Sequence, residues 1–280
     1  MSQEPRSAGP VSGDTYASRH ARDFESPTSR RARREVYGSD YPADARPRSF
    51  ITLSELCRIT RELRVGSGQT IVDLGCGWGG PGLWVARETG ASLLGIDLSR
   101  VGIARAREHA AEVSLADRAS FQVGDLTMTG LPEASFDGAM SVDVLWSVPD
   151  KPAALRECAR ILKPGARFTF TNWDRDLSPP GYLPPLADHR PLLEQVGFEV
   201  ETYEVQPDGE RLRGEYYERL VAAEVDLIDE IGEEETGKLM ASAKGNLGLV
   251  DGTRYLDHSR RILVVARRRV ASDERVSGTA

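Results

Sequence analysis

Three absences narrow what this chain of 280 residues can be. It has no apolar run near the roughly 20 residues that span a membrane, and its polar N-terminus lacks the apolar core of a signal peptide. Its three cysteines, Cys57, Cys76 and Cys158, show neither metal-ligand spacing nor a pairing pattern. A net charge of −7 gives no overall attraction to nucleic acid. We therefore expect a cytoplasmic protein with no metal, no membrane contact and no nucleic-acid partner.

Lysine is also scarce, since only four of the 36 basic residues are lysines and the rest are arginines. One local basic cluster, Arg30 to Arg34, has acidic residues on both sides and no aromatic platform on which bases could stack. We interpret it as a solvated face or part of an arm. Nucleic acid stays a minor alternative partner on the strength of this cluster.

The most informative stretch is a short apolar run that breaks into glycines. Ile71-Val72-Asp73-Leu74 leads into Gly75-Cys76-Gly77-Trp78-Gly79-Gly80, and a second apolar run then ends at Asp97. Glycines let the backbone turn tightly and approach a ligand, and an acid at the end of the next strand can accept both hydroxyls of a ribose. The pattern predicts a site for a cofactor that contains adenosine.

The glycines alone do not say which cofactor binds, because Gly75, Gly77 and Gly80 also satisfy the dinucleotide fingerprint. The choice depends on Asp73. A dinucleotide needs its pyrophosphate over this loop, and a carboxylate two residues before the first glycine would place negative charge beside it. Asp73 favours a cofactor that is positively charged there, and a nicotinamide oxidoreductase becomes the less favoured alternative.

At these residues the chain resembles the class I S-adenosylmethionine (SAM)-dependent methyltransferases, and the resemblance extends from about residue 52 to 270. Asp73-Leu74-Gly75-Cys76-Gly77 corresponds to the first motif of the family, Gly95 to Ser99 to the second and Val123 to Leu126 to the third. Leu131-Pro132 with Ser135 to Ser141 is similar to the entrance to the family's fourth strand, and Leu162 to Ala166 is similar to the turn before its fifth strand.

The resemblance implies SAM as the cofactor. In it Asp97 would hold the ribose, Asp125 would reach the adenine amino group and Leu126 would pack near the ring. The full set of residues expected at the cofactor is Asp73, Gly75, Cys76, Gly77, Asp97, Leu98, Asp125, Leu126 and Ser141.

Short apolar runs alternate with segments of helical period, which is typical of an α/β fold with a parallel sheet. Together with the resemblance, this predicts a Rossmann-like sheet of seven mostly parallel strands, with helices on both faces, an antiparallel C-terminal edge and lid helices. Strands are expected at Thr70–Leu74, Ser92–Ile96, Ala119–Val123, Phe136–Val142, Arg167–Thr171, Glu199–Gln206 and Arg261–Val270. Helices are expected at Thr52–Leu63, Gly80–Glu88, Ser99–Val113, Pro152–Ile161, Gly214–Ile231 and Glu233–Ala243.

Composition and the resemblance together divide the chain into four parts. Residues 1–29 are too polar to form a core and are expected to be a disordered arm, followed by an N-terminal cap segment at 30–51. The methyltransferase domain is expected at 52–270, with a lid inserted at about 207–258, and residues 271–280 form a tail.

Methyl transfer needs positioning, and it needs a base only when the nucleophile is protonated. The segment after strand four, Asp143 to Asp150, lacks the histidine pair that similar O-methyltransferases often have there. This disfavours base-assisted methylation of a hydroxyl group. The candidate catalytic residues are Trp146, Tyr41 and Asp143, and the candidate substrate-binding residues are Tyr37, Trp146, Trp173, Tyr217 and Tyr255.

The sequence therefore predicts SAM-dependent methyl transfer to a small, largely apolar metabolite of bacterial secondary metabolism. Whether nitrogen, carbon or oxygen is methylated stays open, as does assembly into a homo-oligomer. A non-methylating enzyme on the same fold, such as a cyclase, is the main alternative, because these motifs indicate binding and not transfer. An RNA methyltransferase is a minor one.

Overall fold

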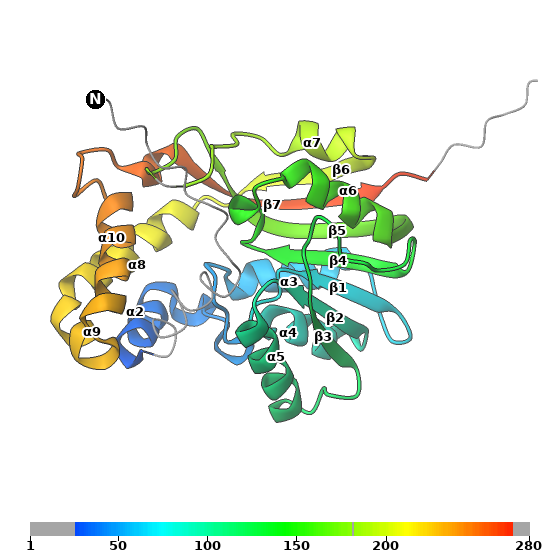
Figure 1. The fold of residues 1–280 in the computed structure, drawn as a ribbon, viewed down its shortest axis with the longest axis horizontal. Coiled ribbons are helices and arrows are strands. Elements are labelled where there is room, and N and C mark those ends of the chain that lie inside the picture. Colours follow the sequence, from blue (N-terminus) through cyan, green and yellow to red (C-terminus); the bar gives the residue numbers. More distant parts are fainter. Residues whose placement is uncertain (1–25, 181, 271–280) are drawn as a thin grey trace, which may run out of the picture.

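The computed structural model of the protein describes residues 26–180 and 182–270, and the predicted tail and most of the predicted arm lie outside these ranges. Its centre is one sheet of seven strands in the order β3-β2-β1-β4-β5-β7-β6 (Figure 1). The strands are β1 (Thr70–Leu74), β2 (Ser92–Asp97), β3 (Ala119–Val123), β4 (Phe136–Val142), β5 (Leu162–Arg175), β6 (Phe198–Val205) and β7 (Ser259–Arg268). β7 pairs antiparallel with both β5 and β6, and the remaining pairs are parallel. The predicted sheet is confirmed.

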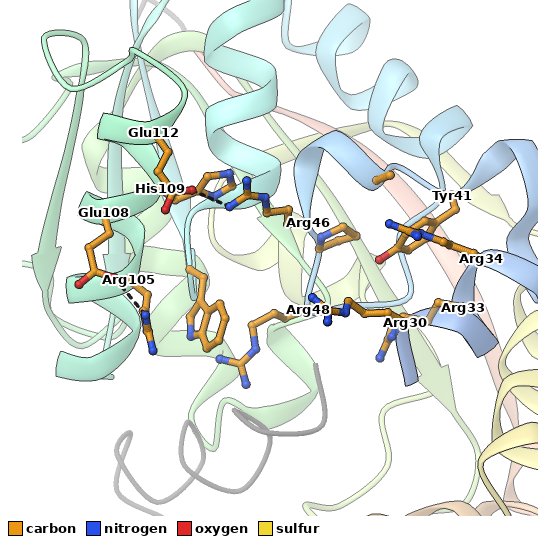
Figure 2. A pocket seen from close by; sticks show the side chains of 13 residues that line it. Arg30, Arg33, Arg34, Tyr41, Arg46, Arg48, Arg105, Glu108, His109 and Glu112 are labelled. Atoms are coloured by element: carbon orange, nitrogen blue, oxygen red, sulfur yellow. Dashed lines mark hydrogen bonds and ion pairs between the residues drawn. The ribbon is translucent and has the colours of Figure 1, made fainter. Parts of the chain in front are cut away.

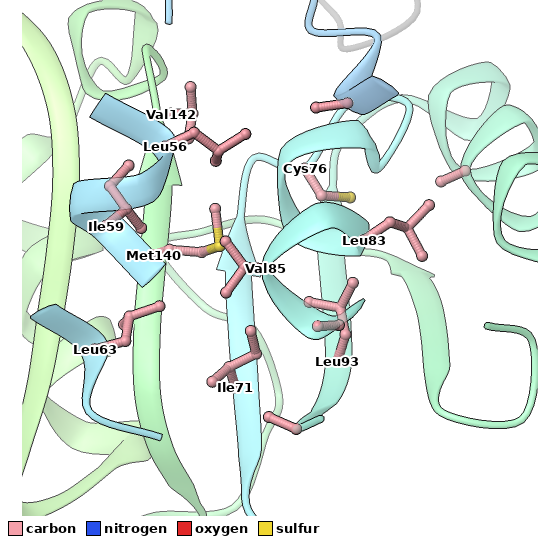
Figure 3. Packing of buried hydrophobic residues seen from close by; sticks show 14 of the residues in the cluster. Leu56, Ile59, Leu63, Ile71, Cys76, Leu83, Val85, Leu93, Met140 and Val142 are labelled. Carbon is pink, nitrogen blue, oxygen red and sulfur yellow. The ribbon is translucent and has the colours of Figure 1, made fainter. Parts of the chain in front are cut away.

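Helices cover both faces of the sheet. Neighbouring residues of each strand point to opposite faces, so one strand contributes side chains to the apolar clusters on both faces. On β1, Ile71 belongs to the cluster beneath α3 (Leu53–Leu63), α4 (Gly80–Thr89) and α5 (Arg100–Glu112), part of which Figure 3 shows. The next residue, Val72, belongs to the cluster beneath α6 (Lys151–Ile161) and α7 (Arg190–Gln195). A strand with apolar residues on both faces is what a sheet buried on both sides requires.

A third apolar cluster lies in a separate group of helices beside the sheet (Figure 1). The group consists of α2 (Pro27–Tyr37), α8 (Gly209–Ala222), α9 (Glu224–Ile231) and α10 (Glu233–Asn246). Tyr216 and Leu220 of α8 are in this cluster, together with Ala32 of α2. The N-terminal segment and the C-terminal helices therefore share one small core. No helix in the described ranges is long and apolar enough to cross a bilayer.

The structure corrects four details of the sequence-based prediction. The single helix predicted at Gly214–Ile231 is two helices, α8 and α9, separated at Ala223. The arm predicted to end at residue 29 already contains the first turn of α2, because the Ser26 hydroxyl caps that helix. The turn predicted at Leu162–Ala166 is the start of β5. The short helix α7 was not predicted, because six residues carry too little periodicity.

The described part of the chain also contains four short 3-10 helices: η1 (Gly38–Asp40), η2 (Ala43–Ala45), η3 (Leu145–Ser147) and η4 (Tyr255–His258). Two of them matter for the site. η2 packs on the start of α4, and η3 follows the carboxyl end of β4. Both lie in loops that the hydrophobic pattern did not assign to any element.

Candidate active site

The glycine loop after β1 is tied to the end of β2. The backbone N–H groups of Gly75 and Cys76 both donate to the carbonyl of Ile96, at 2.8 and 3.0 Å. The carboxylate of Asp97 then accepts the N–H of Gly77 at 2.9 Å through one oxygen and the N–H of Ser99 at 2.8 Å through the other. These bonds hold the acid beside the loop, with its side chain half-buried.

Gly77 gives this loop an open side. Its φ is +54°, a backbone conformation that favours glycine, and a Cβ atom built there would meet nothing within 4 Å. A ligand can therefore approach the loop backbone closely. Together with a carboxylate at the end of the next strand, this arrangement fits the ribose of an adenosine-containing cofactor.

The loop after β3 lies against the same acid. The N–H of Gly124 donates to the carbonyl of Asp97 at 3.0 Å, which brings Asp125 and Leu126 to this edge of the sheet. Leu126 is buried, whereas Leu98 is 51% exposed and offers an apolar surface. The Asp125 carboxylate accepts the N–H and the hydroxyl of Thr127, both at 2.8 Å, so it also orders its own loop.

Asp73 and Ser141 support the loop from the strand ends. The Ser141 hydroxyl donates to the Leu74 carbonyl at 2.7 Å and joins β4 to β1. Asp73 is only 2% exposed and accepts a hydrogen bond from the backbone of Gly82, in the first turn of α4. Burial, with a smaller contribution from the charge of Asp97, raises the pKa of Asp73 to about 7. Cys76 packs in the apolar cluster, where burial raises the pKa of its thiol.

Asp143, at the end of β4, is fully engaged by the protein. Its Oδ2 accepts the backbone N–H of Phe50 at 2.9 Å, and its Oδ1 accepts the Thr171 hydroxyl at 3.0 Å and Nη1 of Arg261 at 2.8 Å. The same guanidinium binds Glu55 at the start of α3 through Nε and Nη2, at 2.7 and 3.0 Å. This buried network joins the N-terminal segment to the centre of the sheet.

Trp146 follows β4, as the sequence predicted, whereas Trp173, which was predicted to follow the fifth strand, lies on β5. The surroundings of the two tryptophans differ. Trp146 is half-buried, and its indole N–H donates to the Asp143 carbonyl at 2.9 Å. Trp173 is buried beneath the guanidinium groups of Arg213 and Arg261, whose centres lie 4.7 and 5.2 Å from its ring. Both line one narrow hollow. Of the two, Trp146 is the more accessible to a substrate.

The four candidate tyrosines do not form one group. Tyr37 packs edge-to-face on Tyr41 with ring centres 6.3 Å apart, and burial raises the pKa of Tyr37. Tyr41 lines a cavity between α2 and α5 (Figure 2). Tyr217 is buried beside Phe50, and Tyr255 donates its hydroxyl to Asp251 at 2.9 Å. Tyr37 and Tyr217 therefore lie near the buried network around Asp143, whereas Tyr41 lies in the cavity lining and Tyr255 lies beside Asp251.

Sequence reasoning did not single out Arg261, Glu55 or Arg213. Arg261 is a charged residue directly before the apolar run Ile262 to Ala266, and a buried charge requires a partner. That position was the available signal. Its partners, however, are 206 and 118 residues away in sequence, so no local pattern could identify them.

His189 is a second group that the sequence left undefined. Its Nδ1 lies 2.7 Å from the Asp174 carboxylate and its Nε2 lies 2.9 Å from the side-chain nitrogen of Asn172. The Asn172 amide oxygen accepts the backbone N–H of Trp146 at 3.2 Å. The Asn172 amide nitrogen is therefore the donor toward His189, and Nε2 of His189 accepts. His189 is therefore a buried histidine that orients Asn172 and, through it, Trp146.

Comparison with known proteins agrees with this geometry. Residues 72–170 match the protein family described as "Methyltransferase domain". Methyltransferase GfsG of Streptomyces halstedii is 34% identical over 115 residues, which is 41% of this chain and 41% of that protein. The matches cover less than half the length of this and other curated relatives.

Two solved structures extend the likeness to the whole fold. The [4+2]-cyclase SpnF superimposes with a TM-score of 0.71 and 23% identity, over 94% of this chain and 100% of the cyclase. Phosphoethanolamine N-methyltransferase 2 of Haemonchus contortus, solved in complex with SAM, has a TM-score of 0.69 and 22% identity, over 94% of this chain and 61% of that enzyme. At these identities the likeness establishes the fold.

Proposed function

We propose that this chain, as a member of the class I SAM-dependent methyltransferase family, transfers a methyl group from SAM to a small and largely apolar metabolite. The observation that supports the proposal is the set of groups at the carboxyl ends of β1, β2 and β3. There, hydrogen bonds join the open glycine loop, Asp97 and the Asp125 loop along one edge of the sheet.

Each group at this edge has a defined task in the proposal. Asp97 accepts the two ribose hydroxyls with the oxygen lone pairs that its bonds to Gly77 and Ser99 leave available. Leu98 and Leu126 lie on the two loops that would enclose the adenine, and Asp125 would receive its amino group. The backbone of Gly75 and Gly77 lies under the methionine portion, and Asp73 and Ser141 hold that backbone in place from behind.

The network around Asp143 limits the chemistry that follows. When bound, SAM supplies an electrophilic methyl group on a sulfonium. A base near it would be needed to deprotonate an alcohol, and Asp143 is occupied by Arg261, Thr171 and Phe50, while His189 is occupied by Asp174 and Asn172. We infer that the acceptor is an amine or an electron-rich carbon, for which positioning is sufficient.

Trp146 is the residue that we assign to substrate contact. Its indole is anchored by a hydrogen bond to the Asp143 carbonyl, with the Tyr182 ring centre 5.9 Å and the Arg175 guanidinium 5.6 Å from the indole ring. The half-buried indole would contact the acceptor beside the methyl group. An indole face also stabilises a cation, which suits methylation of an amine or an alkene. The similarity to methyltransferase GfsG of the bacterium Streptomyces halstedii supports a role in bacterial secondary metabolism. The α8–α10 helices would close over this region as a lid.

A cyclase is a second candidate, favoured by one specific observation. The fold likeness to the [4+2]-cyclase SpnF includes the lid helices, since it covers 94% of this chain. In such an enzyme the cofactor would serve as a scaffold, and the buried Asp143 network would need no catalytic proton transfer.

Binding and turnover experiments separate these possibilities. Isothermal titration should give micromolar affinity for SAM and its demethylated product and no heat with NADH. Incubation of SAM carrying a labelled methyl group with panels of amines and polyenes should then transfer label and release S-adenosylhomocysteine. A cyclised product formed with intact SAM would instead support the cyclase, and binding of NADH alone would contradict both proposals.

A further inference from the structure

A cavity of about 370 Å³ lies between α2, the segment Tyr41 to Arg48 and α5, and we call it the arginine cavity (Figure 2). Six arginines line it: Arg30, Arg33, Arg34, Arg46, Arg48 and Arg105. Its volume is within the range of small-molecule sites. The residues that line it are not those at the strand ends that form the proposed cofactor site.

The charge of this cavity is opposite to that of the protein. Its lining contains six arginines and two acids, Glu108 and Glu112, whereas the whole chain carries a net charge of −7. Glu112 pairs with Arg46 at 2.7 Å and Glu108 with Arg105 at 3.2 Å, so both acids already have partners. The positive charges outnumber the negative ones by four, and such a concentration inside a concave surface attracts anions.

The positions of the arginines follow from helical spacing. Arg30, Arg33 and Arg34 are three and four residues apart on α2, so they share one face of that helix. In Figure 2 they lie on one side of Arg46 and Arg48, and Arg105, Glu108 and His109 of α5 lie on the other side. Guanidinium groups that converge from three segments can offer paired N–H donors to phosphate oxygens.

A second, independent observation comes from two buried ring nitrogens in the lining. Nε1 of Trp78 and Nε2 of His109 are buried and have no hydrogen-bond partner within residues 26–180 and 182–270. The His109 ring is hydrogen-bonded to the Trp78 backbone, and the guanidinium of Arg48 lies 4.4 Å from the centre of the Trp78 ring. An indole N–H donates only, and leaving it unpaired has a cost that an acceptor in the cavity would remove.

We propose that the arginine cavity binds the phosphate or diphosphate group of a small molecule, at a site separate from that of SAM. Arg30 and Arg34, the exposed arginines of α2 in the lining, contact the phosphate oxygens together with Arg46 and Arg48, and the Trp78 indole donates one further hydrogen bond. The concave shape favours a terminal phosphate group over a nucleic-acid strand, for which the lining offers no series of stacking rings. Trp78 lies next to Gly77, so the occupied cavity adjoins the cofactor loop.

The test is titration of the full-length chain with pyrophosphate at low ionic strength, by calorimetry and by tryptophan fluorescence. We expect submillimolar affinity. The double variant Arg30→Gln/Arg34→Gln should bind at least about tenfold more weakly, since each lost charged hydrogen bond reduces affinity by about that factor. Arg156→Gln/Arg269→Gln removes two exposed arginines outside the cavity lining and should bind within about twofold of wild type.

Trp78→Phe is a second variant, which keeps an aromatic ring but removes the donor. It should weaken pyrophosphate binding severalfold and abolish the fluorescence change. If the Arg30→Gln/Arg34→Gln variant fails to fold, the Trp78→Phe titration tests whether pyrophosphate binds in the arginine cavity. The proposal is overturned if wild type does not bind, if both double variants lose affinity equally, or if single-stranded RNA binds and pyrophosphate does not displace it. SAM affinity measured on the same samples shows separately whether the cofactor site is intact.

Discussion

Arg261 of β7 and Asp143 at the end of β4 form a buried ion pair, 2.8 Å apart, with side chains 2% and 6% exposed. Glu55 at the start of α3 binds the same guanidinium through two further bonds. Arg261 thus joins three parts of the fold: β7 at the antiparallel edge, the end of β4 just before the loop that contains Trp146, and α3, the first helix after the N-terminal cap.

Replacing this arginine should be strongly destabilising. Arg261→Leu leaves Asp143 and Glu55 buried without a cation, which should lower the free energy of unfolding by about 3 to 5 kcal/mol. Urea denaturation followed by circular dichroism measures the loss. The control is Arg260→Leu, the adjacent residue, whose pair with Asp176 is exposed and should contribute less than about 1 kcal/mol. Equal small losses in both variants would mean that the buried pair is not a structural link.

Asp97 should be essential for cofactor affinity. Asp97→Ala removes the acceptor for the ribose and should weaken SAM binding by about 1.5 to 3 kcal/mol, through loss of charge-assisted hydrogen bonds. Isothermal titration with SAM measures this, and the exposed Asp117→Ala serves as the control of equal charge. Unchanged affinity in Asp97→Ala would remove this residue from the cofactor site.

Trp146 should affect turnover more than cofactor binding. Trp146→Ala removes the indole that we assign to the acceptor, so the turnover rate should fall at least about tenfold while SAM affinity changes less than about twofold. Single-turnover kinetics with labelled SAM, alongside titration, separates the two effects. Trp84→Ala on α4, outside this region, should leave both unchanged apart from stability. Equal losses of affinity and turnover in Trp146→Ala would place its side chain at the cofactor.

Asp73 should make stability depend on pH. Because burial raises its pKa to about 7, the folded chain keeps a proton between about pH 4 and 7 that the unfolded chain has released. The stability from this proton is fully present below the unfolded pKa and is lost as pH rises through 7. Asp73→Asn has no such charge and should therefore be more stable than wild type at pH 8, by up to about 4 kcal/mol, and similar to it at pH 4.

Denaturation curves of both proteins across this pH range provide the check for Asp73. The exposed Asp117→Asn should follow wild type at every pH. A constant difference between Asp73→Asn and wild type, independent of pH, would show that Asp73 stays ionised in the folded protein.

Gly80 should be required for docking of the N-terminal cap. A Cβ atom at this position would lie 1.8 Å from the carbonyl oxygen of Ala45 in η2, so Gly80→Ala must push the cap away from α4. We expect a loss of at least about 2 kcal/mol and faster proteolysis within residues 38–51. The matched control is Gly237→Ala on α10, where a Cβ meets nothing and the better helix former should stabilise by up to about 1 kcal/mol. Normal stability of Gly80→Ala would mean that the cap does not need this contact.

The positions of strands β1 to β5 along the chain and the place of Asp73, Asp97 and Asp125 at strand ends followed from sequence alone. These features depend on local patterns: a short apolar run, a glycine turn and an amphipathic segment recur within a few tens of residues. The boundaries were least certain where the pattern is weakest. The break between α8 and α9 at Ala223, for example, has neither glycine nor proline to mark it.

The cap was harder to interpret. Arg30 to Arg34 read as a solvated face, because in sequence its neighbours are acidic. In the fold Arg30, Arg33 and Arg34 line a cavity with Arg46, Arg48 and residues of α5, and the acids that reach this cavity come from α5. No local pattern contains that information, since the cavity is assembled from three segments.

By itself, the sequence determined the strands and the glycine loop, because each is encoded by residues that are close together in the chain and act through backbone geometry, while its resemblance to the methyltransferase family implied the antiparallel edge and the cofactor. The tertiary structure alone decided that Asp143 is bound by Arg261 and that six arginines converge beside Trp78. Electrostatic partners in a folded protein are chosen by proximity in space. For Arg261 and Glu55 that means 206 residues of intervening chain, over which side-chain pairing leaves no periodic signal.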